Sequence, residues 1–184
     1  MKRLLMSFCV VVSLLLVPKE ITQAQDLSDK FVVDIKQQIQ KEKQIECLAD
    51  NIYHEAKGES FKGKVAVAFV TLNRTMSSFF PDNVCSVVKQ KNERGCQFSW
   101  YCQSNKKAKS QKKLLTKETE PVYNESRKVA EYVYYNHKHI NDPTKGATFY
   151  HADYVSPSWR MSFKQTTKIG KHIFYKPKPE VRNI

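Results

Sequence analysis

Two apolar segments joined by a short glycine-containing turn constrain the fold of this chain most strongly. The first covers residues 44–57, where apolar side chains recur at the spacing of one helical face and Gly58 follows as a natural stop. The second, residues 65–72, is apolar on all sides, so periodicity alone does not separate a buried strand from a buried helix. Its length and its continuation through Asn73 and Arg74 favour a helix. The stripe of the first segment is Ile45, Leu48, Ala49, Ile52 and Ala56.

The rest of the chain adds one more long helix and then a change of pattern. Residues 84–90 fit a short helix, and residues 123–139 fit a long amphipathic one. Residues 147–150 read as a strand, and residues 167–175 as a strand or a tight hairpin hinged at Gly170. Helices followed by a small β element near the C-terminus predict an α+β domain.

The N-terminus has the pattern of a secretory signal peptide over residues 1–24. Lys2 and Arg3 precede an uncharged run from Leu4 to Val17, and residues 22–24 (Thr-Gln-Ala) offer small residues where a signal peptidase would cut. The run is shorter than the roughly 20 residues that span a bilayer, although an uncleaved signal anchor stays open as an alternative. We therefore expect a secreted or periplasmic protein without a stable transmembrane segment after cleavage.

Composition changes along the exported part suggest its boundaries. Residues 25–43 form a polar leader that could be an amphipathic arm or a loosely held helix. A single domain is expected over residues 44–176, since one domain commonly takes roughly 100–200 residues. Residues 177–184 read as a flexible tail.

Four cysteines remain after the expected signal peptide. In an oxidising compartment, four cysteines imply two disulfides with three possible connectivities. Cys96 and Cys102 would close a very small loop at little entropic cost, which leaves Cys47 and Cys85 as the second pair. The spacing does not fit a zinc site, so we expect structural disulfides and no metal or cofactor.

The net charge of +13 predicts an acidic partner. Nucleic acid, anionic membrane and wall polymer all attract such a chain, but export makes nucleic acid an unsuitable partner. The anionic surface of the cell envelope is therefore the expected one.

Glu55 is the candidate for acid–base chemistry. It lies at the edge of the apolar stripe of residues 44–57, where loss of solvation would raise the pKa of a carboxyl group toward that of a general acid. The competing interpretation is a solvated glutamate paired with Lys57. His54 next to it resembles the start of a zinc-protease motif, but Gly58 stands where the second histidine would be. His137 and His139 fit helix C-terminal caps.

Several blocks in order carry a resemblance to a known family. They are Glu46–Glu59 (ECLADNIYHEAKGE), Val65–Arg74, Phe80–Cys85, Cys96–Trp100, Gly146–His151 with Trp159, and Ile169–Phe174. Together they cover about residues 45–175 and resemble the SleB-type cell wall hydrolase family. The resemblance implies a peptidoglycan-lytic enzyme with a lysozyme-like or transglycosylase-like helical core and a small β subdomain. It also implies that Glu55, in the motif Glu-Ala-Lys-Gly-Glu, is the catalytic acid.

The mechanism expected from that resemblance is cleavage between N-acetylmuramic acid and N-acetylglucosamine by a lytic transglycosylase. A hydrolytic muramidase would need a second carboxylate, for which Glu59 and Asp153 are candidates. The residues expected to line the glycan cleft are Gln97, Phe98, Ser99, Tyr150, His151 and Trp159, although the aromatic loop after His151 fits plain packing equally well.

Two other classes of function remain open from the sequence. A zinc amidase or peptidase would use His54, His137, His139 or His151, and a non-catalytic wall-binding module would need none of them. Asn73 and Arg74 are interpreted as structural residues at a helix end.

Overall fold

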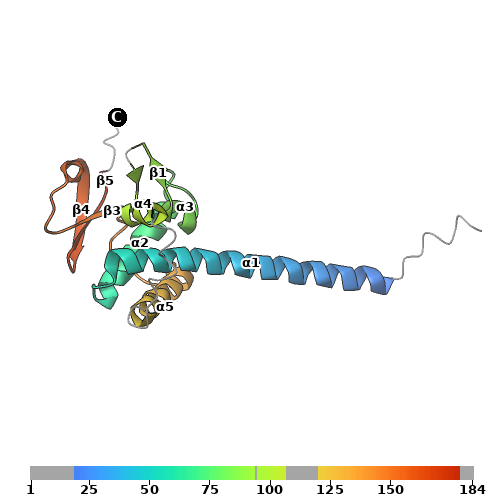
Figure 1. Cartoon of the computed structure of the whole chain (residues 1–184). Helices are drawn as coiled ribbons and strands as arrows, with labels where there is room; N and C mark the ends of the chain where they lie inside the picture. Colours follow the sequence, from blue (N-terminus) through green and yellow to red (C-terminus); the bar gives the residue numbers. More distant parts are fainter. Residues whose placement is uncertain (1–18, 94, 107–119, 179–184) are drawn as a thin grey trace, which may run out of the picture. The chain divides into compact units, whose positions relative to one another are not determined.

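The computed structural model describes residues 19–93, 95–106 and 120–178 (Figure 1). The chain forms two compact units, residues 1–41 and residues 42–184, and helix α1 (Lys19–Ala56) contributes to both. Most of the predicted signal peptide, most of the lysine-rich residues 103–120, and residues 179–184 of the predicted tail lie outside the described residues.

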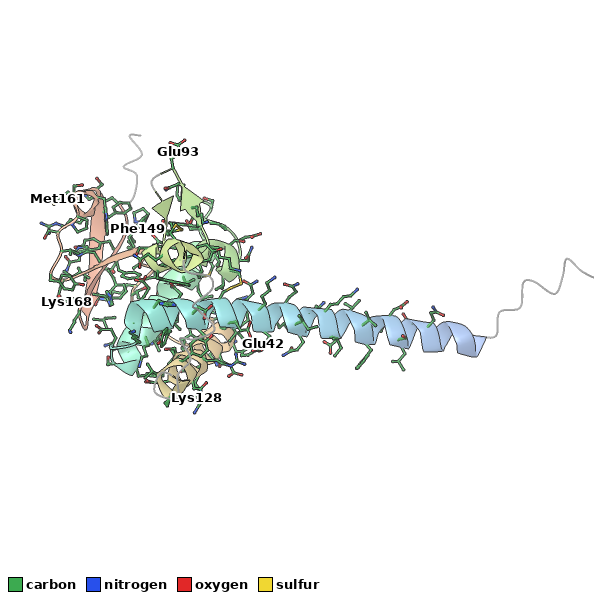
Figure 2. All side chains as sticks on the ribbon, in the orientation of Figure 1. Glu42, Glu93, Lys128, Phe149, Met161 and Lys168 are labelled. Carbon is green, nitrogen blue, oxygen red and sulfur yellow. A yellow bond between two sulfur atoms is a disulfide. The ribbon has the colours of Figure 1, made fainter. Side chains whose placement is uncertain are left out.

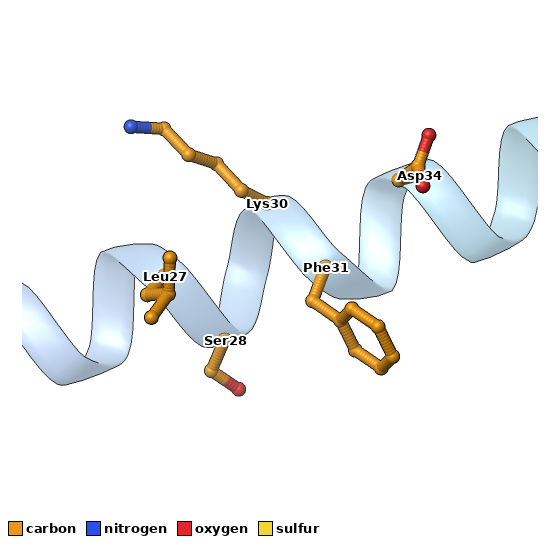
Figure 3. A pocket seen from close by; sticks show the side chains of 5 residues that line it. All are labelled: Leu27, Ser28, Lys30, Phe31 and Asp34. Atoms are coloured by element: carbon orange, nitrogen blue, oxygen red, sulfur yellow. The ribbon is translucent and has the colours of Figure 1, made fainter.

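The described part of the first unit is the N-terminal portion of α1. The apolar side chains of residues 25–41 are exposed, among them Leu27 and Phe31. A shallow hollow there is lined by residues of α1. Lys30 and Asp34 extend from one side of the ribbon, and Ser28 and Phe31 extend from the other (Figure 3). Within the described residues, no helix is both long and apolar enough to cross a membrane.

Helix α2 (Phe61–Thr75) is the central helix of the second unit, as the all-round apolar pattern of residues 65–72 predicts. Ser60 caps its N-terminus by accepting a hydrogen bond from the Gly63 backbone N–H. All residues from Gly63 to Leu72 are buried. The C-terminal part of α1, α3 (Val84–Val88) and α5 (Glu120–Asn136) supply the core around α2. The largest buried side chains of these four helices are Ile45, Leu48, Ile52, Val67, Val70, Val87, Val88 and Val133.

A small element between α3 and α5 is missing from the sequence-based expectation. Strands β1 (Lys91–Asn92) and β2 (Gly95–Cys96) pair antiparallel, and helix α4 (Ser99–Lys106) follows them. We expected a polar loop here, because α4 is polar and has no apolar stripe to mark it. Contacts with other parts of the fold hold this segment in place, and a periodic pattern in the sequence does not reveal such contacts.

Two disulfides fix the helices and this small element, with the predicted connectivity. Cys47–Cys85 joins α1 to α3, and Cys96–Cys102 joins β2 to α4.

Three antiparallel strands form the C-terminal sheet in the order β3-β5-β4 (Figure 1). They are β3 (Phe149–Ala152), β4 (Phe163–Ile169) and β5 (His172–Pro177), and a 3₁₀ helix, η2 (Ser158–Ser162), precedes β4. β4 and β5 form the hairpin that the glycine at position 170 suggests, and Gly170 has a φ of 56°. The turn needs glycine for this backbone, and a Cβ at this position would also displace the Glu59 carboxylate.

The fold is therefore mostly helical with a small antiparallel sheet near the C-terminus, as predicted. The sheet packs against the helices through Phe174 and Ala147, which share a buried cluster with Ala66 and Val70 of α2. This contact brings β3 to the C-terminal ends of α1 and α2, where the site lies.

Candidate active site

Glu55 is the penultimate residue of α1, and its carboxyl group meets Tyr150 of β3. The Tyr150 hydroxyl donates a hydrogen bond to Glu55 Oε2 at 3.0 Å. The tyrosine ring is fixed by an edge contact with His172 and a tilted contact with Phe174, with centroid distances of 5.1 and 5.7 Å. The carboxyl group is thus partly buried at a defined place where the sheet approaches the helices.

Arg74, in the last turn of α2, supplies a buried positive charge to the same place. Its side chain is 2% exposed, and Nε donates to the Thr148 carbonyl oxygen at 2.8 Å. The guanidinium also lies over the rings of Phe80, Phe98 and Phe149, the last of which is labelled in Figure 2. Such an aromatic enclosure stabilises a cation that has lost its hydration.

Electrostatics at Glu55 are a balance of opposing influences. Burial raises the pKa of Glu55, whereas the hydrogen bond from Tyr150 and the charge of Arg74 each act to lower that pKa. Burial lowers the pKa of Arg74 to about 10, so the guanidinium stays charged at neutral pH. Burial also raises the pKa of Tyr150 well above its ordinary value, so its hydroxyl stays a donor. The arrangement favours a carboxyl group that can hold a proton and can also release it.

The two candidates for a second carboxylate have other partners. Glu59 accepts a hydrogen bond from the Lys171 backbone N–H at 3.4 Å and packs against Gly170. Asp153 forms an ion pair with Lys168 at 2.8 Å, and that hydrogen bond lowers the pKa of the Asp153 carboxyl. Both contacts tie the carboxylates to the β4–β5 hairpin.

The six residues expected to line a glycan cleft divide by exposure. Gln97 and Ser99 are exposed, whereas Tyr150 and Trp159 are partly buried. Two are interior residues: Phe98 is 4% exposed with its ring against Arg74, and His151 is 8% exposed.

His151 and Trp159 belong to an aromatic cluster on the sheet. His151 stacks on Tyr175, contacts the Tyr175 hydroxyl through Nε2 at 3.0 Å, and contacts the Ala152 carbonyl oxygen through Nδ1 at 2.8 Å. The Trp159 ring packs edge-on against both His151 and Tyr175. These contacts match the packing alternative for this loop at least as well as a sugar-binding wall.

Arg74 is the site residue that sequence reasoning misses. We interpreted Asn73 and Arg74 together as structural, and Asn73 does have that role, because its side-chain amide donates to Asp142 and to the Ala147 carbonyl oxygen. The available signal was the position of an arginine at the end of a helix that is apolar on every face. A charged side chain there must either leave the core or be paired within it.

The histidines do not gather into a metal-binding group. Across residues 19–93, 95–106 and 120–178, no three His, Cys, Asp or Glu side chains are placed to hold a metal ion together. The His137 Nδ1 atom lies 3.0 Å from the Tyr134 carbonyl oxygen, in keeping with a helix-terminal role.

Sequence comparison places the chain among known proteins. The profile of the family described as Cell Wall Hydrolase matches residues 58–175, more than half of the chain and beginning just after Glu55. The spore cortex-lytic enzyme of Halalkalibacterium halodurans is 32% identical over 131 residues, which cover 71% of this chain but 34% of that protein. The chain thus spans about a third of the length of this relative.

Two solved structures share the fold. The catalytic domain of the Bacillus cereus SleB protein aligns with a TM-score of 0.52 at 28% identity, covering 72% of this chain and 89% of that domain. The catalytic domain of the germination-specific lytic transglycosylase SleB from Bacillus anthracis aligns with a TM-score of 0.50 at 28% identity, covering 72% and 93%. With its sequence and its fold both matched, the chain belongs to the cell wall hydrolase family.

Proposed function

We propose that this protein is a peptidoglycan-lytic glycosidase that cleaves the bond between N-acetylmuramic acid and N-acetylglucosamine, with Glu55 as the acid. The observation that carries the proposal is the carboxyl group of Glu55, whose pKa is raised by burial, which accepts a hydrogen bond from Tyr150 and which the charge of Arg74 influences. The family match and the likeness to the Bacillus anthracis lytic transglycosylase support the choice of substrate and of reaction type.

The first step is proton transfer from Glu55 to the glycosidic oxygen. The bond from that oxygen to C1 of the muramic acid then breaks, and positive charge develops on the ring as in other glycoside cleavages. Glu55 becomes an anion in this step. The Tyr150 hydroxyl and the Arg74 charge both favour the anion, so they lower the free energy of the state that follows proton transfer.

The second step favours a transglycosylase. The C6 hydroxyl of the muramic acid attacks C1 and gives its proton to the Glu55 carboxylate, which forms a 1,6-anhydro ring and restores the starting acid. One carboxyl group suffices, because the attacking hydroxyl is already held on the substrate. Glu59 and Asp153, the candidates for a second carboxylate that could activate water, have partners on the β4–β5 hairpin instead.

The chain's charge fits a wall polymer and an exported protein. A net charge of +13 would raise the rate of encounter with an anionic envelope and would have less effect as salt screens it. We place the protein outside the cytoplasm, secreted or periplasmic and associated with the wall.

The test is digestion of purified peptidoglycan followed by mass spectrometry of the muropeptides. Termini lighter by one water than the reducing ends would support the transglycosylase. Reducing muramic acid ends would support the hydrolytic muramidase instead. New amino groups without glycan cleavage would overturn the glycosidase proposal. The matched control for Glu55→Gln is Glu131→Gln, which changes an exposed glutamate on α5. This control variant should digest the wall as the unmodified protein does.

A further inference from the structure

The residue before Glu55 in the chain belongs to a stacked pair of aromatic rings that has no part in the mechanism above. His54 of α1 and Trp100 of α4 stack with ring centroids 4.3 Å apart and an interplanar angle of 14°. His54 is exposed and Trp100 is partly buried. Neither residue is among those expected from the sequence to line the cleft.

The tryptophan is held firmly by the helices below it. Its Nε1–H donates to Asn51 Oδ1 at 3.2 Å, and the Asn51 amide donates in turn to Thr71 Oγ1 of α2 at 3.1 Å. Asn51 and Thr71 are both fully buried. The disulfide Cys96–Cys102 closes the loop that carries Trp100. A ring with its only donor satisfied and its backbone closed by a disulfide is fixed in advance of any ligand.

The pair lies along the part of α1 that carries the acid. Trp100 contacts α1 at Asn51 and His54, which are four residues and one residue before Glu55. Residues four apart lie one above the other on a helix, about 6 Å apart along its axis. Trp100 therefore contacts the same turn of α1 that carries Glu55, so a glycan placed on Glu55 would pass close to the pair.

A second stacked histidine, His151, shows how a ring pair that packs the interior differs from one that is available to a ligand. His151 stacks on Tyr175 but is buried, and both of its ring nitrogens have hydrogen-bonding partners inside the sheet cluster. His54 stacks equally well but remains exposed. Loss of solvation where the ring packs against its neighbours, followed by the charge of Lys57, lowers the pKa of His54, so at neutral pH the imidazole is uncharged and suits an uncharged ligand.

We propose that the His54–Trp100 pair is a stacking face for one sugar ring of the glycan strand, next to the bond at which Glu55 acts. This inference rests on the proposed function. The ligand is an uncharged N-acetylated hexose of the strand rather than its stem peptide. The C–H face of such a sugar carries small positive partial charges, which the negative faces of aromatic rings attract.

Binding is tested in a chain that cannot turn the ligand over. In Glu55→Gln, the dissociation constant for glycan strands stripped of their stem peptides is measured by calorimetry. Adding His54→Ala should raise that constant by on the order of tenfold, and His54→Phe, which keeps a flat ring, should restore it. The matched control is His139→Ala, another exposed histidine, which should leave the constant unchanged. His54 is the residue to change first because its exposure makes unfolding a poor explanation for a loss of binding.

Kinetics separate this inference from the proposed function. With Glu55 intact, His54→Ala should raise KM, leave kcat within about twofold and leave the pH profile unmoved. If the wall is cleaved and His54→Ala changes neither KM nor the dissociation constant, the stacking face is overturned while the function stands. If strands bind through His54 but no glycan bond is cut, the function fails while the stacking face stands. A shifted pH profile in His54→Ala would mean that His54 acts through Glu55, which also overturns the proposal.

Discussion

Two of the carboxyl groups on helix α1 lie five residues apart, and each of these two accepts a hydrogen bond from a tyrosine. Glu55 accepts from Tyr150 and Asp50 accepts from Tyr123, both at 3.0 Å. Burial raises the pKa of both carboxyl groups. By the usual signs of a functional acid, a raised pKa and a partly buried hydrogen-bonding partner, the two pairs are nearly equivalent.

Their counter-charges differ. Besides its tyrosine, Glu55 has the buried guanidinium of Arg74. Asp50 has Glu46, which raises its pKa further, and the exposed Lys89, which lowers it least of all the contributors. A carboxyl group that must lose a proton and then regain it needs a fixed, desolvated cation to balance its charged state. The comparison therefore singles out Glu55 through Arg74 and not through its proton affinity.

The largest expected effect comes from removing the acid itself. Glu55→Gln should lower the rate of glycan cleavage by about 10²- to 10⁴-fold, because general acid catalysis contributes about that much. Asp50→Asn should leave the rate within about twofold. Muropeptide release under identical conditions measures both, and equal losses in the two variants would remove the distinction between the pairs.

Removing the cation should have the next largest effect. Arg74→Met takes away a charge that lowers the pKa of Glu55, so the fall of activity at the basic side of the pH profile should move to higher pH. The variant also leaves the Thr148 carbonyl oxygen without its donor, at a cost of about 1–3 kcal/mol in the free energy of unfolding. A pH profile of kcat/KM beside a thermal melt checks both, and an unmoved profile would remove Arg74 from the electrostatics of the site.

Tyr150→Phe tests the hydrogen bond alone. The ring packing against His172 and Phe174 is kept, but the donor to Glu55 is lost. A hydrogen bond to a charged group contributes about 1.5–3 kcal/mol, so kcat should fall roughly tenfold or more. The basic side of the profile should again move to higher pH. Tyr123→Phe is the paired control, and it should leave kcat unchanged.

The smallest effect concerns stability at the second pair. The folded-state pKa of Asp50 is raised above its unfolded value, so its contribution to stability is complete at acid pH and is lost as pH rises through the raised pKa. Asp50→Asn removes this dependence. The melting temperature of Asp50→Asn minus that of the unmodified protein should therefore be larger at neutral pH than at acid pH. A difference that stayed constant with pH would show that Asp50 ionises in the folded protein as it does when unfolded.

The contrast between the two pairs also shows how far the sequence can be read. The apolar stripe of residues 44–57 predicted the helix that presents Glu55, because local periodicity reports burial. The run of residues 65–72 has no such periodicity, and its length and its continuation through Arg74 predicted the second helix. Glu55 stood out through its place at the edge of the stripe and through the family motif.

The partners of Glu55 were beyond such reasoning. Tyr150 lies 95 residues from Glu55 along the chain, and the packing of the sheet against the helices joins them. The three rings around Arg74 come from three separate segments. Helix α4 was missed for a related reason, because long-range contacts position it in the absence of an apolar face.

The contact between Glu59 and Gly170 has a consequence for how the protein tolerates change. Gly58 has open space around the position of a side chain, so it should accept alanine in a substitution library. Gly170 faces the Glu59 carboxylate with a left-handed backbone, so a side chain there strains the turn and displaces the Glu59 carboxylate that contacts it. β5 of that hairpin pairs directly with β3, the strand of Tyr150. A position that touches neither substrate nor acid is thus coupled to the geometry of both, and loss of function at Gly170 would come from misalignment in a folded enzyme.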